Sequence, residues 1–369
     1  MPSFFYIFSY NLDDMQLKST FKKLKHLVNG VLGSADIALD LGTSFTRLGI
    51  SSKGVVLREP SYIGQNTRTG DFLFFGTEAK EIYGKAPNFI HISRPVEHSI
   101  ISDFDKTVLL LKHFMDKAVY PFFLNRTILK NKLYGYAVVP TSSTEVEQKA
   151  TIEALAKVGI SDTYLIEKPL AAACGAGLSV FSKNPYFIID LGGGSVEMAV
   201  IVMGGIVTFK TLKNGGEHMD KLLYNYLHLK NGIIIGEQTA EQLKISLFTL
   251  VEDNAVMTVR GKSLENGLPK SIRVRTTEVK EALINNLNQI IDSAKEMMET
   301  VPPEIVDGII KNGLTLTGGM ANIKGINKYF SNELKIPVEV PERPQDCTIQ
   351  GLLKLLEEPE KLRQIIINK

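Results

Sequence analysis

Two short turns combine an aspartate, glycines and hydroxyl side chains directly after an apolar stretch. They are Asp40-Leu41-Gly42-Thr43-Ser44 and Asp190-Leu191-Gly192-Gly193-Gly194-Ser195. Because glycine has no β-carbon, its backbone N–H groups can approach a phosphate closely, and a neighbouring hydroxyl can donate to that phosphate. An aspartate at a strand end can orient a magnesium-bound water. We therefore predict that both turns hold nucleotide phosphates, with Asp40 and Asp190 reaching Mg²⁺ through water.

Either turn alone could equally be the tight entry to a β-hairpin. Two turns of the same composition, each followed by hairpin-like sequence, argue against that interpretation. A third glycine pair, Gly318-Gly319, follows the apolar stretch 313–317 and would let the backbone lie flat against a base or ribose. Taken alone, this pair is equally consistent with a strand-to-helix turn.

The sequence contains no Walker A motif, no dinucleotide-binding fingerprint and no protein-kinase signature. We therefore expect a site assembled from several distant turns. Closure of the cleft between two domains is then the expected conformational variable.

The elements that must position these turns alternate between strand and helix, and the order strand, turn, hairpin occurs twice. This repetition predicts an internal duplication. Thr144 and Glu147 fit a helix-capping box rather than a catalytic pair. Apolar periodicity places strands at 37–40, 48–50, 55–57, 134–139, 163–166, 186–190, 197–202, 205–212, 313–317 and 337–340. It places helices at 108–119, 144–157, 169–177, 277–300, 325–334 and 351–367.

Bulk composition favours a soluble protein of two domains. The chain has 369 residues, of which 44% are hydrophobic and 22% charged. Its net charge of +2 gives no reason to expect nucleic acid as a partner. The two cysteines, Cys174 and Cys347, suit a reducing cytoplasm, and we expect both in the core. No apolar run reaches the roughly 18–20 residues that span a bilayer.

The extension 1–34 differs from the rest of the chain. It contains a basic amphipathic segment that is best explained as a helix lying on a membrane surface. A helix packed on the body, or a disordered segment, is the alternative, and Met15 is an alternative start to Met1. The residues assigned to the membrane are Leu17, Phe21, Leu24, Val28, Lys18, Lys22, Lys23 and Lys25. A second candidate patch, 120–129, could equally be a buried loop.

The three glycine motifs resemble those of the actin, heat-shock-chaperone and sugar-kinase ATPase superfamily. Within it, the chain from about Ala35 to Leu355 resembles MreB, the bacterial actin homologue that helps to determine cell shape. Longer stretches carry this resemblance, namely Gly54-Val55-Val56-Leu57-Arg58-Glu59-Pro60-Ser61, Leu165-Ile166-Glu167-Lys168-Pro169-Leu170-Ala171-Ala172-Ala173, Ile235-Gly236-Glu237-Gln238-Thr239-Ala240-Glu241 and Gly267-Leu268-Pro269-Lys270.

The resemblance implies an α/β, actin-like ATPase fold with two duplicated domains, divided into four subdomains, around an ATP–magnesium cleft. It also implies assembly into paired protofilaments and attachment beneath the cytoplasmic membrane. The expected boundaries are 35–63 with 106–181 and 343–369 for subdomain IA, 64–105 for IB, 182–216 with 283–342 for IIA, and 217–282 for IIB.

Carried over by position, the resemblance assigns ATP or ADP contacts to individual residues. The phosphates would be held by Gly42, Thr43, Ser44, Gly192, Gly193, Gly194 and Ser195, with Asp40 and Asp190 serving the magnesium shell. Gly318, Gly319 and Met320 match the adenosine motif. Glu241 and Lys244 match the family pair near the adenosine, although an ordinary solvated pair one helical turn apart is the alternative.

This chain departs from the family pattern at Lys168. The family has a glutamate before this proline, and that carboxylate positions the water that attacks the γ-phosphate. A lysine cannot accept a proton from water, although it could pair with the phosphate. Glu167 is a poor substitute, because successive side chains of an extended segment point to opposite sides. The family's threonines are also replaced, by Ser195 and Val196. We therefore expect ATP hydrolysis to be slow or lost, unless another group takes over.

The leading hypothesis is thus a filament-forming cytoskeletal protein that polymerises with itself. An ATPase-competent homologue is a candidate second partner in the filament. A chaperone of the same superfamily would be expected to carry a long substrate-binding region after the ATPase domain. A small-molecule kinase would need a carboxylate aimed at a substrate hydroxyl, which the lysine at 168 fits poorly.

Overall fold

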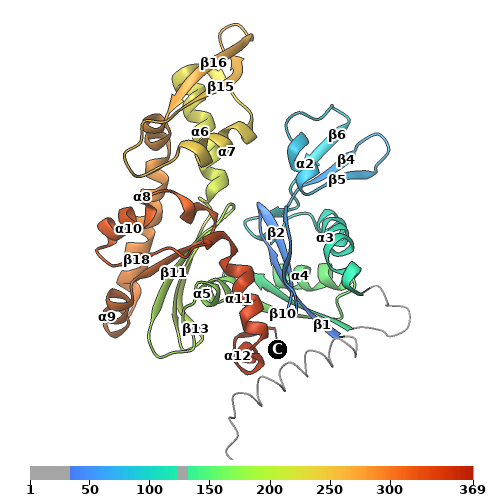
Figure 1. Cartoon of the computed structure of the whole chain (residues 1–369), viewed down its shortest axis with the longest axis vertical. Coiled ribbons are helices and arrows are strands. Elements are labelled where there is room, and N and C mark those ends of the chain that lie inside the picture. The colour runs from blue at the N-terminus through green and yellow to red at the C-terminus, as the bar shows by residue number, and fades with distance from the viewer. Residues whose placement is uncertain (1–33, 124–131, 369) are drawn as a thin grey trace, which may run out of the picture.

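The computed structural model describes residues 34–123 and 132–368. It consists of two α/β halves side by side, each built on a five-stranded sheet (Figure 1). The first sheet has the order β10-β9-β1-β2-β3, and its strands are Asp162–Glu167, Lys132–Val139, Ser34–Leu41, Phe45–Ile50 and Gly54–Pro60. The second has the order β13-β12-β11-β17-β18, and its strands are Gly205–Leu212, Val196–Val202, Tyr186–Leu191, Leu314–Thr317 and Val338–Glu339.

The two sheets repeat one arrangement, which confirms the predicted duplication. β1 pairs antiparallel with β2 and parallel with β9, just as β11 pairs antiparallel with β12 and parallel with β17. The turn after each leading strand is closed by the same bond. The Gly42 N–H donates to the Phe45 carbonyl at 3.2 Å, and the Gly192 N–H donates to the Ser195 carbonyl at 3.0 Å.

Each half carries a smaller outer part at the same end of the molecule (Figure 1). The outer part of the first half consists of β4 (Ile63–Asn66), β5 (Phe72–Phe75), α2 (Thr77–Ile82) and β6 (Ile90–Ser93). That of the second half consists of α6 (Gly216–Asn231), β14 (Ile233–Ile234), α7 (Glu237–Leu247), β15 (Val256–Ser263) and β16 (Pro269–Arg275).

Helices cover the sheets with apolar faces. The longest, α8 (Thr276–Thr300), buries Leu283, Leu287 and Ile290 completely, at helical spacing. α3 (Phe104–Ala118) begins at Asp103, whose carboxylate accepts the Lys106 N–H at 3.1 Å. α4 (Glu145–Lys157) begins with the predicted capping box, because Thr144 and Glu147 exchange their two bonds.

Two helices meet in the middle of the molecule (Figure 1). They are α5 (Lys168–Gly175) and α11 (Cys347–Leu356). A β-carbon added at Gly175 would lie 1.8 Å from the Cys347 carbonyl oxygen, and one added at Gly351 would lie 1.7 Å from the Ala171 carbonyl oxygen. Only glycine allows two helix backbones to approach so closely. Both cysteines lie near this contact; Cys347 is buried and Cys174 partly so, and burial raises the pKa of each thiol to about 12.

The structure corrects three details of the sequence prediction. The expected C-terminal helix 351–367 is two helices, α11 and α12 (Pro359–Ile365), because a proline has no N–H and disfavours helical geometry in the residue before it. Helix α9 (Pro303–Asn312) is not among the helices expected from the sequence, although a proline in the first turn, as at Pro303, is typical of a helix start. Lys168 is the first residue of α5, and not part of an extended segment.

The remaining helix, α10 (Ile326–Leu334), packs beside α8, and β7 (Val96–Glu97) pairs with β8 (Ile100–Ile101). Over 34–123 and 132–368, none of the helices combines the length and apolarity needed to cross a bilayer. The amphipathic segment with its eight assigned membrane residues lies outside the described part of the chain, as do residues 124–129 of the second candidate patch. Its Phe122 is exposed, at 48%.

Candidate functional site

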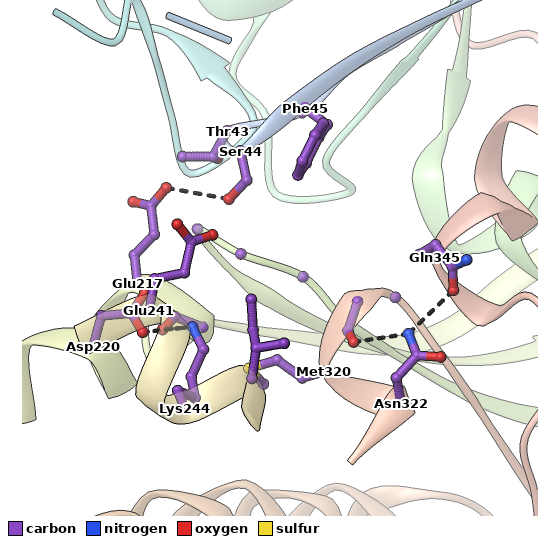
Figure 2. Close-up of a pocket in the computed structure, with 18 of the residues that line it drawn as sticks. Thr43, Ser44, Phe45, Glu217, Asp220, Glu241, Lys244, Met320, Asn322 and Gln345 are labelled. Atoms are coloured by element: carbon purple, nitrogen blue, oxygen red, sulfur yellow. Dashed lines mark hydrogen bonds and ion pairs between the residues drawn. The ribbon is translucent and has the colours of Figure 1, made fainter. Parts of the chain in front are cut away.

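A cavity of about 1010 Å³ lies between the two halves, below their outer parts. That is large enough for a nucleotide-sized ligand. Figure 2 shows side chains from both halves converging on it. Of the residues predicted to bind nucleotide or to influence its hydrolysis, those that line it are Asp40, Gly42, Thr43, Ser44, Lys168, Asp190, Gly192, Gly193, Gly194, Glu241, Lys244, Gly318, Gly319 and Met320. Ser195 does not line it, and its side chain is buried.

The two glycine turns face each other at the base of this cavity. A β-carbon at Gly193 would lie 2.0 Å from Ser44 Oγ, and one at Gly194 would lie 2.3 Å from Thr43 Oγ1. The Thr43 hydroxyl also accepts the Ser99 N–H at 2.8 Å. His98 Nδ1 lies 2.6 Å from the Gly194 carbonyl oxygen. The turns therefore present backbone and hydroxyl groups from both halves to one space, as a phosphate chain requires.

Lys168 is buried at the base of the cavity among acidic side chains. Its ammonium lies 2.8 Å from Asp190 Oδ2 and 3.7 Å from Glu197 Oε1. Burial opposes the charged form, but the carboxylates of Asp190 and Glu197 outweigh burial and raise the pKa of Lys168. Burial raises the pKa of Glu197 to about 7, against the influence of Lys168. The lysine is therefore a fixed cation and cannot serve as a base.

A second cation holds the aspartate of the first turn. Arg47 lies directly opposite Asp40 in the β1–β2 pair, and its Nη1 is 2.9 Å from Asp40 Oδ2. The Nε of Arg47 is 3.5 Å from Asp346 Oδ1, just before α11. The arginine side chain is only 12% exposed, so two carboxylates fix its position in the cavity wall.

These contacts do not fit the magnesium site predicted from the sequence. Asp190 has both oxygens engaged, Oδ2 by Lys168 and Oδ1 by the Thr317 hydroxyl at 2.9 Å. Asp40 is engaged by Arg47. A hydrated dication would have to compete with a resident positive charge at each carboxylate. Within 34–123 and 132–368, no three His, Cys, Asp or Glu side chains are grouped as metal ligands.

Glu241 and Lys244 lie on α7 at the cavity wall, but each has another partner. Glu241 Oε2 is 2.8 Å from Lys80 Nζ. Lys244 Nζ is 2.7 Å from Asp220 Oδ1 and donates to the Gly216 carbonyl at 2.7 Å. Figure 2 shows Lys244 and Met320 on one side of the cavity, and Asn322 bonded to Gln345 on another. The alternative of an ordinary Glu241–Lys244 pair is thus not what the structure contains.

Several contacts cross the mouth of the cavity and hold its two sides together. Arg94 Nη1 is 2.8 Å from Glu217 Oε1, and the Ser44 hydroxyl donates to the same oxygen at 3.3 Å. The Tyr83 hydroxyl donates to Glu237 at 3.0 Å. Gln238 Nε2 donates to the Lys80 carbonyl. In the described structure, the outer parts of the two halves are therefore joined by direct side-chain contacts.

The sequence prediction missed most of these partners. Only Arg47 carried a local signal. The second strand of the hairpin begins at Phe45, three residues before the expected strand 48–50, and this longer strand places Arg47 opposite Asp40. Arg94, Glu217, Lys80 and Asp220 belong to elements far apart in the chain, so their meeting required the fold.

Comparison with known proteins identifies the family of this chain. Residues 34–364 match the family model described as MreB/Mbl protein. The chain belongs to the MreB/Mbl family. It is 38% identical to the cell shape-determining protein Mbl of Bacillus subtilis over 329 residues, which is 89% of this chain and 97% of that protein. It is 34% identical to the cell shape-determining protein MreB of Escherichia coli over 330 residues, covering 88% and 94% of the two chains.

Solved structures of the MreB/Mbl family have the same fold. The crystal structure of MreB5 of Spiroplasma citri bound to ADP superposes with a TM-score of 0.84 at 30% identity, covering 90% of this chain and 98% of that one. The crystal structure of MreB5 bound to AMPPNP superposes with a TM-score of 0.83. The structure of a MamK double helical filament superposes with a TM-score of 0.73 at 19% identity. At this low identity, the similarity supports only the actin-like fold. The expected fold class and family are therefore confirmed.

Proposed function

We propose that this protein is a nucleotide-binding, filament-forming MreB-type cytoskeletal protein that acts in cell shape. The observation that carries the proposal is the pair of facing glycine turns, Gly193 against Ser44 and Gly194 against Thr43, at the base of the cavity between the two halves. Relatives with this fold bind ADP and AMPPNP, and the distant MamK forms a filament. The ligand proposed for this chain is accordingly ATP or ADP.

The predicted phosphate and adenosine contacts remain part of this proposal. The cavity-lining positions of Thr43, Ser44, Gly192, Gly193 and Gly194 support the former. Gly318, Gly319 and Met320, at the end of β17, support the latter. Slow or absent hydrolysis follows from Lys168, because a buried ammonium held by Asp190 cannot take a proton from water.

The subdomain boundaries are also proposed. IA comprises 35–63, 106–181 and 343–369, and IB comprises 64–105. IIA comprises 182–216 and 283–342, and IIB comprises 217–282. The separate small sheets β5-β4-β6 and β14-β15-β16 support IB and IIB as distinct units. Arg94–Glu217 and Lys80–Glu241 would then be contacts between IB and IIB.

A position at the inner face of the cell membrane is proposed from the basic amphipathic segment before residue 34. Each lysine near an anionic surface contributes about 1 kcal/mol, so a single copy would bind weakly. Polymerisation would multiply the copies and make the attachment firm. Copolymerisation with an ATPase-competent homologue is proposed because Lys168 leaves this chain without the expected catalytic carboxylate.

The decisive experiment compares light scattering and negative-stain micrographs of the protein without nucleotide, with ADP and with AMPPNP. A nucleotide-dependent rise in scattering together with filaments is expected. A chaperone or a small-molecule kinase of the superfamily would bind nucleotide and remain unassembled. Nucleotide binding without filaments, alone or with an MreB homologue, would reject the cytoskeletal proposal.

A further inference from the structure

The cleft carries its own positive charge at both places where the sequence predicts metal-bound water. Lys168 Nζ lies 2.8 Å from Asp190, and Arg47 Nη1 lies 2.9 Å from Asp40. Both cations line the cavity that the two glycine turns close. The same two aspartates are thus neutralised by side chains that cannot leave.

The lysine is buried and lies against two carboxylates. It stands at the start of α5, and the second of these carboxylates, Glu197, lies 3.7 Å from its ammonium. A β-carbon added at Gly192 would lie 3.8 Å from Lys168 Nζ, so the ammonium lies close beneath the backbone of the second turn. A cation in this place can interact with an anion bound to that turn.

The arginine is fixed from two sides. Asp40 holds its Nη1, and Asp346 lies 3.5 Å from its Nε. Asp346 is in turn 3.5 Å from Nη1 of Arg58, another cavity residue. A guanidinium stays charged at every physiological pH, so this charge is permanent. Together, the two side chains bring a charge equal to that of one divalent ion.

We propose that this cleft binds a nucleoside di- or triphosphate without a magnesium ion, with Lys168 and Arg47 supplying the positive charge that the metal would supply. The inference rests on the proposed function, because it assumes that the cleft takes a nucleotide. Beyond that function, it specifies the ionic form in which the nucleotide binds, namely the polyphosphate anion without a bound metal ion. A nucleotide that already carries Mg²⁺ brings two further positive charges towards two fixed cations, and it binds no better than the free anion.

The test is nucleotide affinity of the full chain, measured by fluorescence or calorimetric titration with ADP and AMPPNP, in excess MgCl₂ and in excess EDTA. The native protein is expected to bind equally well or more tightly in EDTA. Lys168→Glu adds a carboxylate beside Asp190 and Glu197, and it is expected to lose at least ~10-fold affinity in EDTA while recovering it with Mg²⁺. Lys168→Arg keeps the charge and should bind alike in both buffers. Thermal melting of each variant verifies folding.

The outcomes separate the two proposals. Tight binding by the native protein in Mg²⁺ that is lost in EDTA overturns the metal-free site and leaves the proposed function intact. A failure of the native protein to bind either nucleotide in either buffer overturns both. Equal metal dependence of native protein and Lys168→Glu would also overturn the role given to Lys168.

Discussion

Gly194 and Thr43 lie in direct contact across the cleft, with no room for even one methyl group between them. An added β-carbon at Gly194 would lie 2.3 Å from Thr43 Oγ1, well inside the sum of the atomic radii. The two phosphate turns are therefore set against each other by glycine alone.

Gly194→Ala is accordingly expected to push the turns apart and to weaken ADP binding by ~10-fold or more, because the hydroxyl and the backbone groups would no longer share one site. A titration with ADP measures this loss. Gly205→Ala is the matched control, since its β-carbon would meet only the Val202 carbonyl at 3.6 Å, an ordinary contact. Undiminished binding by Gly194→Ala would contradict the convergence of the turns on one ligand.

Lys168→Glu is expected to speed ATP hydrolysis by ~10-fold or more in the presence of Mg²⁺, because a carboxylate there can accept a proton from the attacking water. Phosphate release measures the rate. Lys168→Gln removes the charge without adding a base, and it should stay as slow as the native protein. Rapid turnover by the native protein that is unchanged in Lys168→Glu would refute the assignment.

Glu197 predicts a pH dependence of stability. Its pKa of about 7 in the folded protein exceeds the value near 4.5 of an exposed glutamate, so the folded state keeps a proton that the unfolded state has lost. Stability should therefore fall as pH rises through about 7, by about 1 kcal/mol between about pH 6 and pH 8. Glu197→Gln has no proton to lose, so its urea midpoint should fall less over this range.

Other groups constrain how that experiment is interpreted. Burial raises the pKa of Asp220 to about 6. The effect of Asp220 on the pH dependence of stability therefore falls largely below about pH 6. Burial lowers the pKa of His113, which acts in the opposite direction. Both are common to native protein and variant, so the difference between the two slopes isolates Glu197. Parallel slopes would show that Glu197 is already ionised at about pH 6.

The cross-cleft pair of Lys80 and Glu241 should slow nucleotide release. Both side chains are partly exposed, so the pair contributes at most about 1 kcal/mol. Lys80→Met removes the charge but keeps an unbranched side chain that is only one atom shorter, and it should raise the dissociation rate of a fluorescent ADP by ~2–5-fold. Lys210→Met is the control, because Lys210 pairs with Glu296 away from the cavity. An unchanged rate in Lys80→Met would mean that release does not require this contact to open.

Deletion of residues 1–33 is expected to abolish co-sedimentation with anionic liposomes while leaving ADP binding intact. The lysines of this segment would meet the headgroups and its leucines the acyl boundary. Neutral liposomes serve as the control for the electrostatic part. Undiminished binding of the shortened chain to anionic liposomes would refute the membrane assignment.

The sequence was most informative where function depends on local chemistry. Strand, glycine turn and hairpin lie within a few residues of one another, so both turns and the duplication could be predicted. The actin-like fold was implied by the family resemblance that these motifs carry. The importance of position 168 was also visible, because a lysine stands where a carboxylate is expected.

The partners of these residues were not visible, because they come from the packing of distant elements. The sequence suggested a phosphate as one partner that Lys168 could have, and in the structure the lysine pairs with Asp190 on the other half of the molecule. Glu241 was assigned to the adenosine, and in the structure it pairs with Lys80. Buried charge pairing depends on which segments the fold brings within about 4 Å, and periodicity does not contain that information.

The helix pair α5 and α11 gives these charges a common support. Lys168 begins α5, and Asp346, which holds Arg47, immediately precedes α11. The two helices touch backbone to backbone at Gly175 and Gly351. A bulky residue at either glycine would therefore alter the ionic character of the cleft from a distance. Second-site mutations that suppress such a substitution are expected at the acidic residues that contact Lys168 and Arg47. A genetic screen could therefore detect the coupling between the helix contact and the cleft without a nucleotide-binding assay.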